Sequence, residues 1–353
     1  MHGASPQLID SSSQRTHTVS ATDDAFLAAD VGGTHARIGL VRRIDGGNGG
    51  GRIRITQYRK FACADYANLH DILREFAQTQ DGPAAKAACI ACAGLQLGDH
   101  LVNANLPWRV SLPHLRKELG FERISLVNDF KAIAYAAHFH SVTQSTHLSG
   151  NDAIDASQPR LVIGPGTGLG AAALIPGNDR PYILATEGGH AALAPHSELE
   201  VEILRHLGAG TKHVPNERVF SGPGLLALYQ TLCTLRAAPD PLHSPTQISA
   251  AALAGNDALA AETVALFCGW FGSLIGDLVM MLGAYGGVYL AGGVLPQIAS
   301  LLKASNFAAR MRDKGPMREA IERVPVYLID HGQLGVAGAA HWFLDHEHGD
   351  GSN

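Results

Sequence analysis

Residues 26–41 read FLAADVGGTHARIGLV, an apolar strand that runs into a Gly-Gly turn and leaves it as a second strand. Residues 160–175, RLVIGPGTGLGAAALI, have the same order of strand, glycine turn and strand. Asp30 in the first segment and Gly164 in the second occupy equivalent places, 134 residues apart. Because a repeated supersecondary unit indicates duplication, we expect two related domains that face each other.

The rest of each half has the pattern of a mixed α/β domain. After the first turn we expect strands at 52–61, 88–93 and 123–127, and helices at 65–78, 112–119 and 130–138. After the second turn we expect a strand at 182–186, a mostly helical region at 196–283, strands at 287–291 and 324–329, and a last helix at 333–345. The alternation of strands and helices predicts βαβ crossovers and a partly parallel sheet.

The composition indicates a soluble, mildly acidic globular protein. A length of 353 residues corresponds to about two domains of roughly 150 residues each. Because 27 basic residues stand against 32 acidic ones with no run of Lys or Arg, we expect no nucleic-acid partner. The five cysteines have no regular spacing, which indicates a reducing cytosol and cytoplasmic localisation. Residues 1–24 show no secretory signal and are interpreted as a disordered tail.

Two segments could suggest other classes of protein. Residues 264–295 are long and apolar enough to span a bilayer, but Gly-Gly pairs at 286–287 and 292–293 and the following Pro296 interrupt them. A buried helix followed by a buried strand fits better, so no membrane partner is expected.

Cys89 and Cys92 form a CxxC inside a predicted buried strand, with no second pair to complete a zinc site.

The two glycine turns suit phosphate, since glycines let backbone N–H groups approach anionic oxygens. Neither turn is a P-loop, because the chain contains no Gly-Lys dipeptide. Residues 166–171 match a relaxed dinucleotide fingerprint, but a strand rather than a helix follows, which disfavours that interpretation. A plain hairpin stays the alternative for each turn taken alone.

Candidate catalytic and binding side chains follow the strands. Asp129 lies where strand 123–127 ends, the edge at which α/β sheets collect ligands, and its carboxylate can accept a proton. A helix N-cap is the alternative role for Asp129. Glu187 and His190, in the segment EGGH, can point together toward the hydroxyls of a sugar. His190 could instead be an ordinary loop histidine, and Glu217 a first-turn acid of the next helix.

The segments that are specific in combination are LAADVGGTHARIGL, NLPW, LVNDFKAIA, IGPGTGLGAA, EGGHAALAP, NERVFSGPGLLALY and GGVYLAGGV. By these segments the chain resembles the bacterial glucokinase family from about residue 26 to 343. This resemblance implies two actin-like ATPase domains, of the ribonuclease H-like α/β type, with the active site in the cleft between them. It also implies a small domain at 25–138, onto which a C-terminal helix at about 331–345 packs back, and a large domain at 139–330.

The resemblance further implies a role for each matching residue. Asp129 would be the catalytic base, and Asp30 would organise a Mg²⁺ ion, through water. The sugar contacts would be Asn105, Asn128, Glu187, His190 and Glu217. The nucleotide contacts would be Gly32, Gly33, Thr34, Gly166, Thr167, Gly168, Gly292 and Gly293, with the last two against the adenosine. The turn reads GGTHAR where family members often have Asn after Thr.

The activity that the resemblance implies is phosphorylation of D-glucose at its 6-hydroxyl by ATP with Mg²⁺, the first step of glycolysis, in a homodimer. A kinase for another hexose, such as mannose or an N-acetylated amino sugar, is the alternative among enzymes. A sugar-responsive regulator is a further alternative, but such a protein needs a DNA-binding module, and 24 polar residues before the first strand cannot hold one.

Overall fold

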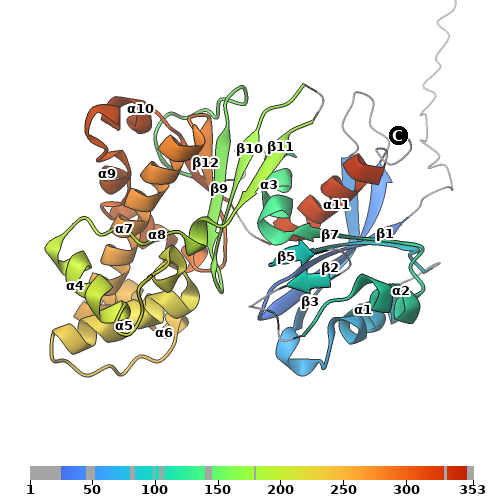
Figure 1. Ribbon diagram of the computed structural model, residues 1–353, viewed down its shortest axis with the longest axis horizontal. Coiled ribbons are helices and arrows are strands. Elements are labelled where there is room, and N and C mark those ends of the chain that lie inside the picture. The colour runs from blue at the N-terminus through green and yellow to red at the C-terminus, as the bar shows by residue number, and fades with distance from the viewer. Residues whose placement is uncertain are drawn as a thin grey trace, which may run out of the picture.

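The computed structural model describes residues 25–44, 52–79, 84–97, 100–102, 106, 108–139, 145–178, 180–329 and 332–347. The expected N-terminal tail lies outside these residues. The described chain forms two α/β units, each built on a central sheet, with two helices between the sheets (Figure 1).

The first sheet has the strand order β3-β2-β1-β4-β7. Its strands are β1 (Phe26–Val31), β2 (His35–Ile44), β3 (Arg52–Ala62), β4 (Ala87–Cys92) and β7 (Arg123–Asn128). The first three are antiparallel, and β4 and β7 continue the sheet in parallel with β1. All residues of β1 and β4 are buried, as expected for strands covered on both faces.

Helices cover both faces of this sheet. One face packs against α1 (Leu69–Gln78) and α2 (Leu112–Leu119), and the other against α11 (Leu334–Glu347). A small hairpin of β5 (Leu95–Leu97) and β6 (His100–Val102), which the sequence did not predict, lies beside β7.

The second sheet repeats the topology of the first. Its strands are β8 (Thr146–Ser149), β9 (Arg160–Pro165), β10 (Leu169–Ile175), β11 (Tyr182–Thr186), β12 (Gly287–Leu290) and β13 (Val326–Leu328). The order β11-β10-β9-β12-β13 matches the first sheet strand for strand, and β8 is an addition at the β13 edge. The expected duplication is therefore confirmed at the level of topology.

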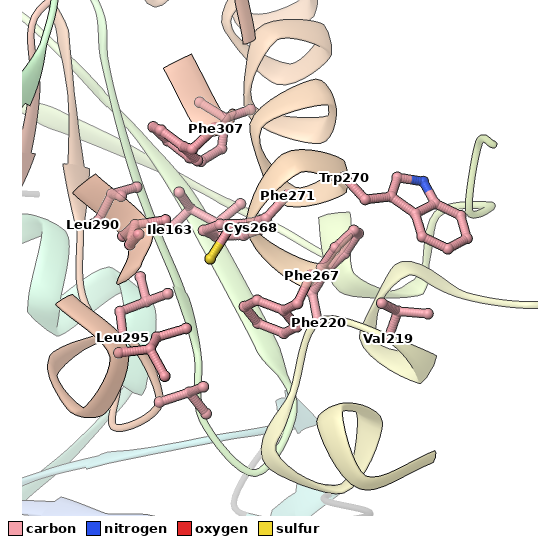
Figure 2. Packing of buried hydrophobic residues seen from close by; sticks show 14 of the residues in the cluster. Ile163, Val219, Phe220, Phe267, Cys268, Trp270, Phe271, Leu290, Leu295 and Phe307 are labelled. Atoms are coloured by element: carbon pink, nitrogen blue, oxygen red, sulfur yellow. The ribbon is translucent and has the colours of Figure 1, made fainter. Parts of the chain in front are cut away.

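The second unit holds most of the helices. They are α4 (Glu198–Leu207), α5 (Gly222–Leu235), α6 (Pro245–Ala254), α7 (Ala258–Leu282), α8 (Ala299–Ala304), α9 (Phe307–Arg312) and α10 (Arg318–Glu322). Figure 2 shows Phe267 and Phe271 of α7 packed with Phe220 and Phe307. Among the described helices, α7 alone has the length and hydropathy to cross a bilayer, and 67% of its apolar window is buried in the protein. It is a core helix.

Two helices connect the units. The helix α3 (Asp129–Phe139) starts at the end of β7 in the first sheet and packs against β9 and β10 of the second. It also packs against α11 (Figure 1). At this crossing a Cβ on Gly338 would lie 1.8 Å from the carbonyl oxygen of Ala132, so only glycine allows the close approach.

Candidate active site

The two glycine turns occupy equivalent places in the two sheets. The first turn connects β1 to β2, where the N–H of Gly32 donates to the carbonyl of His35 at 3.0 Å. The second connects β9 to β10, where the N–H of Gly166 donates to the carbonyl of Gly168 at 2.8 Å. The N–H of Gly222, at the start of α5, donates to the carbonyl of Gly166 at 2.8 Å. Both turns are hairpins tied to the body of their domain.

Three glycines in these turns and after β12 have no packing reason to be glycine. A Cβ on Gly32 would have no neighbour closer than 3.8 Å, and one on Gly166 or Gly293 would meet nothing within 4 Å. None of the three has a left-handed backbone. Gly292 differs, because its φ is +91° and a Cβ would lie 2.5 Å from the carbonyl oxygen of Pro165. Gly292 is therefore required by the fold, whereas the other three leave open space beside the backbone.

Asp129 is the first residue of α3, but the helix cap belongs to its neighbour. The side-chain oxygen of Asn128 accepts a hydrogen bond from the N–H of Lys131 at 3.0 Å, the pattern of an N-cap. The Oδ1 atom of Asp129 accepts from the N–H of Phe130, the very next residue, at 2.9 Å, which is not the pattern of an N-cap. The N-cap alternative for Asp129 is therefore wrong, because the side chain of Asn128 caps the helix.

The electrostatic environment of Asp129 suits a general base. Its pKa is raised to about 6, first by burial and then by the nearby carboxylate of Asp30, while the hydrogen bond from Phe130 opposes the shift. Glu187 makes a smaller contribution in the same direction. A carboxylate with a pKa near neutrality accepts a proton more readily than an ordinary one and is still ionised at pH 7.

Asp30 is buried beside the first turn, with 5% of its surface exposed. Arg37, its partner across the β1–β2 ladder, places Nη1 3.4 Å from its Oδ2. The N-terminal turn of α11 lies directly over the carboxylate at Gly335. An anion is favoured at a helix N-terminus, so this contact suits the carboxylate of Asp30, which lies close enough to Asp129 to influence its pKa.

Three of the five candidate sugar ligands, Glu187, His190 and Glu217, lie together. Nε2 of His190 is 3.9 Å from Oε2 of Glu187, and Nδ1 is 3.7 Å from Oε1 of Glu217. The alternative that Glu217 is a first-turn acid of α5 is wrong, because α5 begins at Gly222. Glu217 lies in the short 3-10 helix η4 (Asn216–Arg218), and its Oε2 accepts from the N–H of Leu169, just after the second glycine turn, at 3.4 Å.

The structure brings Glu187, His190 and Glu217 together from different segments, and Asp129 lies near Asp30. Asn105 lies outside the described residues.

Two further polar residues at the site were not predicted from the sequence. Arg37 could have been found, because a hairpin around the first turn places it opposite Asp30. Asn216 had no sequence signal, since its partners are on another turn.

Each sheet has a glycine turn after its first strand, and two carboxylates with an imidazole lie together near Asp129. This combination is the architecture of a two-domain sugar kinase. The chain belongs to the glucokinase family: the family profile "Glucokinase" matches residues 27–346.

Individual relatives agree with this family. The chain is 47% identical to a "Glucokinase-like protein" of Xylella fastidiosa over 322 residues, 91% of this chain and 95% of the relative. It is 39% identical to the "Glucokinase" of Saccharophagus degradans over 317 residues, 90% and 97% of the two chains. The crystal structure of glucokinase from an Antarctic psychrotroph superposes with a TM-score of 0.76 at 34% identity, covering 91% of this chain and 99% of that one.

Proposed function

We propose that this glucokinase-family chain transfers the γ-phosphoryl group of ATP to the 6-hydroxyl of D-glucose, with Asp129 as the catalytic base. The observation that carries the proposal is the state of the Asp129 carboxylate, which is not used as a helix cap and whose pKa is raised to about 6. As the 6-hydroxyl oxygen attacks the γ-phosphorus, Asp129 accepts the hydroxyl proton.

Glucose would be held by charge-assisted hydrogen bonds from both units. Glu187, His190 and Glu217 supply two carboxylates and an imidazole within hydrogen-bonding range of one small polyol. Asn128 uses its oxygen to cap α3, so its amide N–H₂ is the group left to donate to a sugar hydroxyl. Asn105 is proposed as the remaining contact on the basis of the family pattern.

The nucleotide would lie along the glycine turns. Each turn would offer backbone N–H groups to phosphate oxygens. The residues are Gly32, Gly33 and Thr34 in the first turn and Gly166, Thr167 and Gly168 in the second. The open space at Gly32, Gly166 and Gly293 is where a ligand could approach the backbone. Gly292, by contrast, would shape the adenosine site through its packing against Pro165.

The residues present also fit a magnesium ion. Asp30 and Asp129 are neighbouring carboxylates, and Mg²⁺ prefers such oxygen ligands while keeping part of its water shell. Asp30 would hold the ion through water. When bound, the ion would neutralise charge on the transferring phosphoryl group.

We infer the division of the chain and its context from the same family pattern. The small domain would comprise 25–138 with the helix at about 331–345, and the large domain 139–330. We expect a cytoplasmic homodimer.

A coupled assay of glucose 6-phosphate formation tests the proposal. We expect turnover with ATP that requires Mg²⁺, and glucose as the best substrate in a panel with mannose and N-acetylated amino sugars. The same assay with ADP and polyphosphate shows whether ATP is the only phosphoryl donor. A higher kcat/KM for another hexose would overturn the assignment of glucose.

A further inference from the structure

The turn that carries Glu187 and His190 is held by a neighbouring segment as well as by its own strand, where the N–H of Gly188 donates to Oγ1 of Thr186 at 3.3 Å. The isolated bridge between Ala192 and Pro215 begins this contact. The N–H of Asn216 then donates to the carbonyl of Ala191 at 2.9 Å, and Nε2 of His213 lies 2.9 Å from the carbonyl of His190. The glycine-rich turn therefore depends on the segment 213–216 for its position.

Two side chains of the segment 213–216, His213 and Asn216, contact the turn among the described residues, and of these two Asn216 is the buried one. Its Nδ2 donates to the carbonyl of Gly188 at 2.9 Å, and only 3% of the residue is exposed. Together with its backbone N–H, Asn216 fixes the turn 187–190 at both ends. The next residue along the chain is Glu217, so the same residue sets the distance between the two carboxylates of the sugar cluster.

The neighbouring side chains cannot provide this fixation themselves. Glu187 and His190 have side chains 74% and 62% exposed, and their ion-pair distances of 3.7 to 3.9 Å are too long for strong hydrogen bonds. Such exposed pairs contribute little to the geometry. Their relative positions are set by the backbone of the two turns, and hence by Asn216.

We infer that Asn216 is a positioning residue for sugar binding, which holds the turn 187–190 against Glu217 without touching the sugar. The inference rests on the proposed function, because it takes Glu187, His190 and Glu217 as the sugar contacts. Losing the amide removes the 2.9 Å hydrogen bond to the carbonyl of Gly188, which then keeps only the longer bond, 3.4 Å, from the N–H of Ala191 within the same turn. The turn thereby loses its side-chain tie to the segment 213–216. The contacts that hold glucose are then no longer preorganised, so affinity for glucose falls while ATP affinity is kept.

The first experiment replaces Asn216 by Ala and measures glucose binding by calorimetry and KM and kcat by the coupled assay. We expect Kd and KM for glucose to rise at least fivefold, with KM for ATP unchanged within twofold and kcat within threefold. Thr263→Val is the matched control, because Thr263 is also fully buried and its hydroxyl donates to the carbonyl of Leu259 in α7, away from the site. It should lower the melting temperature without changing glucose affinity.

The second experiment uses Asn216→Asp, which keeps the shape of the side chain and keeps the inference testable if the alanine variant folds poorly. An ionised carboxylate cannot donate to the carbonyl of Gly188, whereas a protonated one can. We therefore expect glucose binding, relative to the unmodified protein at the same pH, to be weakened at pH 8 and restored toward pH 5. The melting temperature is measured at both pH values, because recovery of binding in a variant that is already fully folded at pH 8 separates positioning from a general loss of stability.

The outcomes separate the inference from the function on which it rests. If Glu187→Ala and Glu217→Ala weaken glucose binding but both Asn216 variants bind within twofold of the unmodified protein, the positioning role is wrong and the sugar site stands. If Glu187→Ala and Glu217→Ala leave glucose binding unchanged, the proposed sugar site itself is wrong.

Discussion

Gly335, the second residue of α11, lies against the carboxylate of Asp30. A Cβ at this position would be 2.4 Å from Cγ of Asp30 and 2.6 Å from its Oδ2. The contact joins residues more than 300 positions apart and places the positive end of a helix on the buried carboxylate of the first turn. The C-terminal helix is thus part of the structure that positions Asp30.

This contact makes Gly335→Ala a test of the role of Asp30. The added methyl group has to displace the carboxylate, so we expect kcat to fall at least tenfold and the Mg²⁺ concentration for half-maximal rate to rise. Calorimetric glucose affinity should stay within twofold, because the sugar ligands are elsewhere. Ala337→Ser, a similar addition at a half-buried position of the same helix, is the control and should be nearly neutral. Equal activity of the two variants would contradict the role assigned to Asp30.

The pH dependence of activity should follow the raised pKa of Asp129. The carboxylate accepts a proton only when ionised, and its pKa is about 6, so kcat/KM for glucose should fall as the pH drops through about 6. An ordinary carboxyl would lose activity only near pH 4. A profile from pH 4.5 to 8.5, with stability checked at each pH, measures the midpoint. A plateau that extends to pH 5 would contradict Asp129 as the base.

Asp129→Asn should separate catalysis from stability. We expect kcat to fall by roughly 10² to 10⁴, the usual contribution of a general base, with glucose affinity largely kept. Because the folded pKa is raised, the ionised carboxylate costs stability above pH 6 and costs nothing below about pH 4. The variant should therefore be more stable by about 3 kcal/mol at pH 8, with no gain at pH 4. Denaturant unfolding at both pH values measures this difference.

The strands and turns of the site were predictable from the sequence because they rest on local patterns. The apolar runs around 26–41 and 160–175 predicted both hairpins, and the Gly-Gly breaks separated the core helix α7 from β12. The strand β8 was missed because Thr146–Ser149 is short and only half-buried, so it shows little apolar pattern.

The roles of single polar residues were harder to predict. Asn128 and Asp129 are adjacent and both suit a helix cap, so only the observed hydrogen bond to the N–H of Lys131 decides between them. Asn216 acts through the carbonyl of Gly188, a contact that exists only once two turns meet. Long-range contacts between turns of this kind leave no periodic pattern in a sequence.

The core around α7 gives a stability prediction. A Cβ on Gly272 would lie 2.2 Å from the carbonyl oxygen of Phe307, so α9 packs directly on the helix backbone at this point. Gly272→Ala forces the helices apart and should cost about 1 to 3 kcal/mol or more of unfolding free energy, as overpacking usually does. Met281→Ala on the same helix, where the side chain is 76% exposed, should change stability by less than about 0.5 kcal/mol. Equal unfolding free energies would show that the helices separate without cost.

The last prediction concerns movement of the two units. Asp129 and the first turn belong to one sheet, whereas Glu187 and the second turn belong to the other, and α3 and α11 join them. A sugar that contacts both sides stabilises the arrangement in which they are close, so glucose alone should drive closure. It should also raise the melting temperature, since binding at 100 times Kd adds about 2.7 kcal/mol to the folded state.

Small-angle scattering and hydrogen exchange test this closure. At saturating glucose we expect a smaller radius of gyration and slower exchange in η3 (Gly188–His190) and at the start of α3. Glu217→Ala at the same glucose concentration is the control and should show neither change, because it lacks a contact from the second unit. If scattering and exchange stay unchanged while calorimetry shows that glucose is bound, the sugar does not drive closure. The site is then either already closed when empty or closes only when the nucleotide binds.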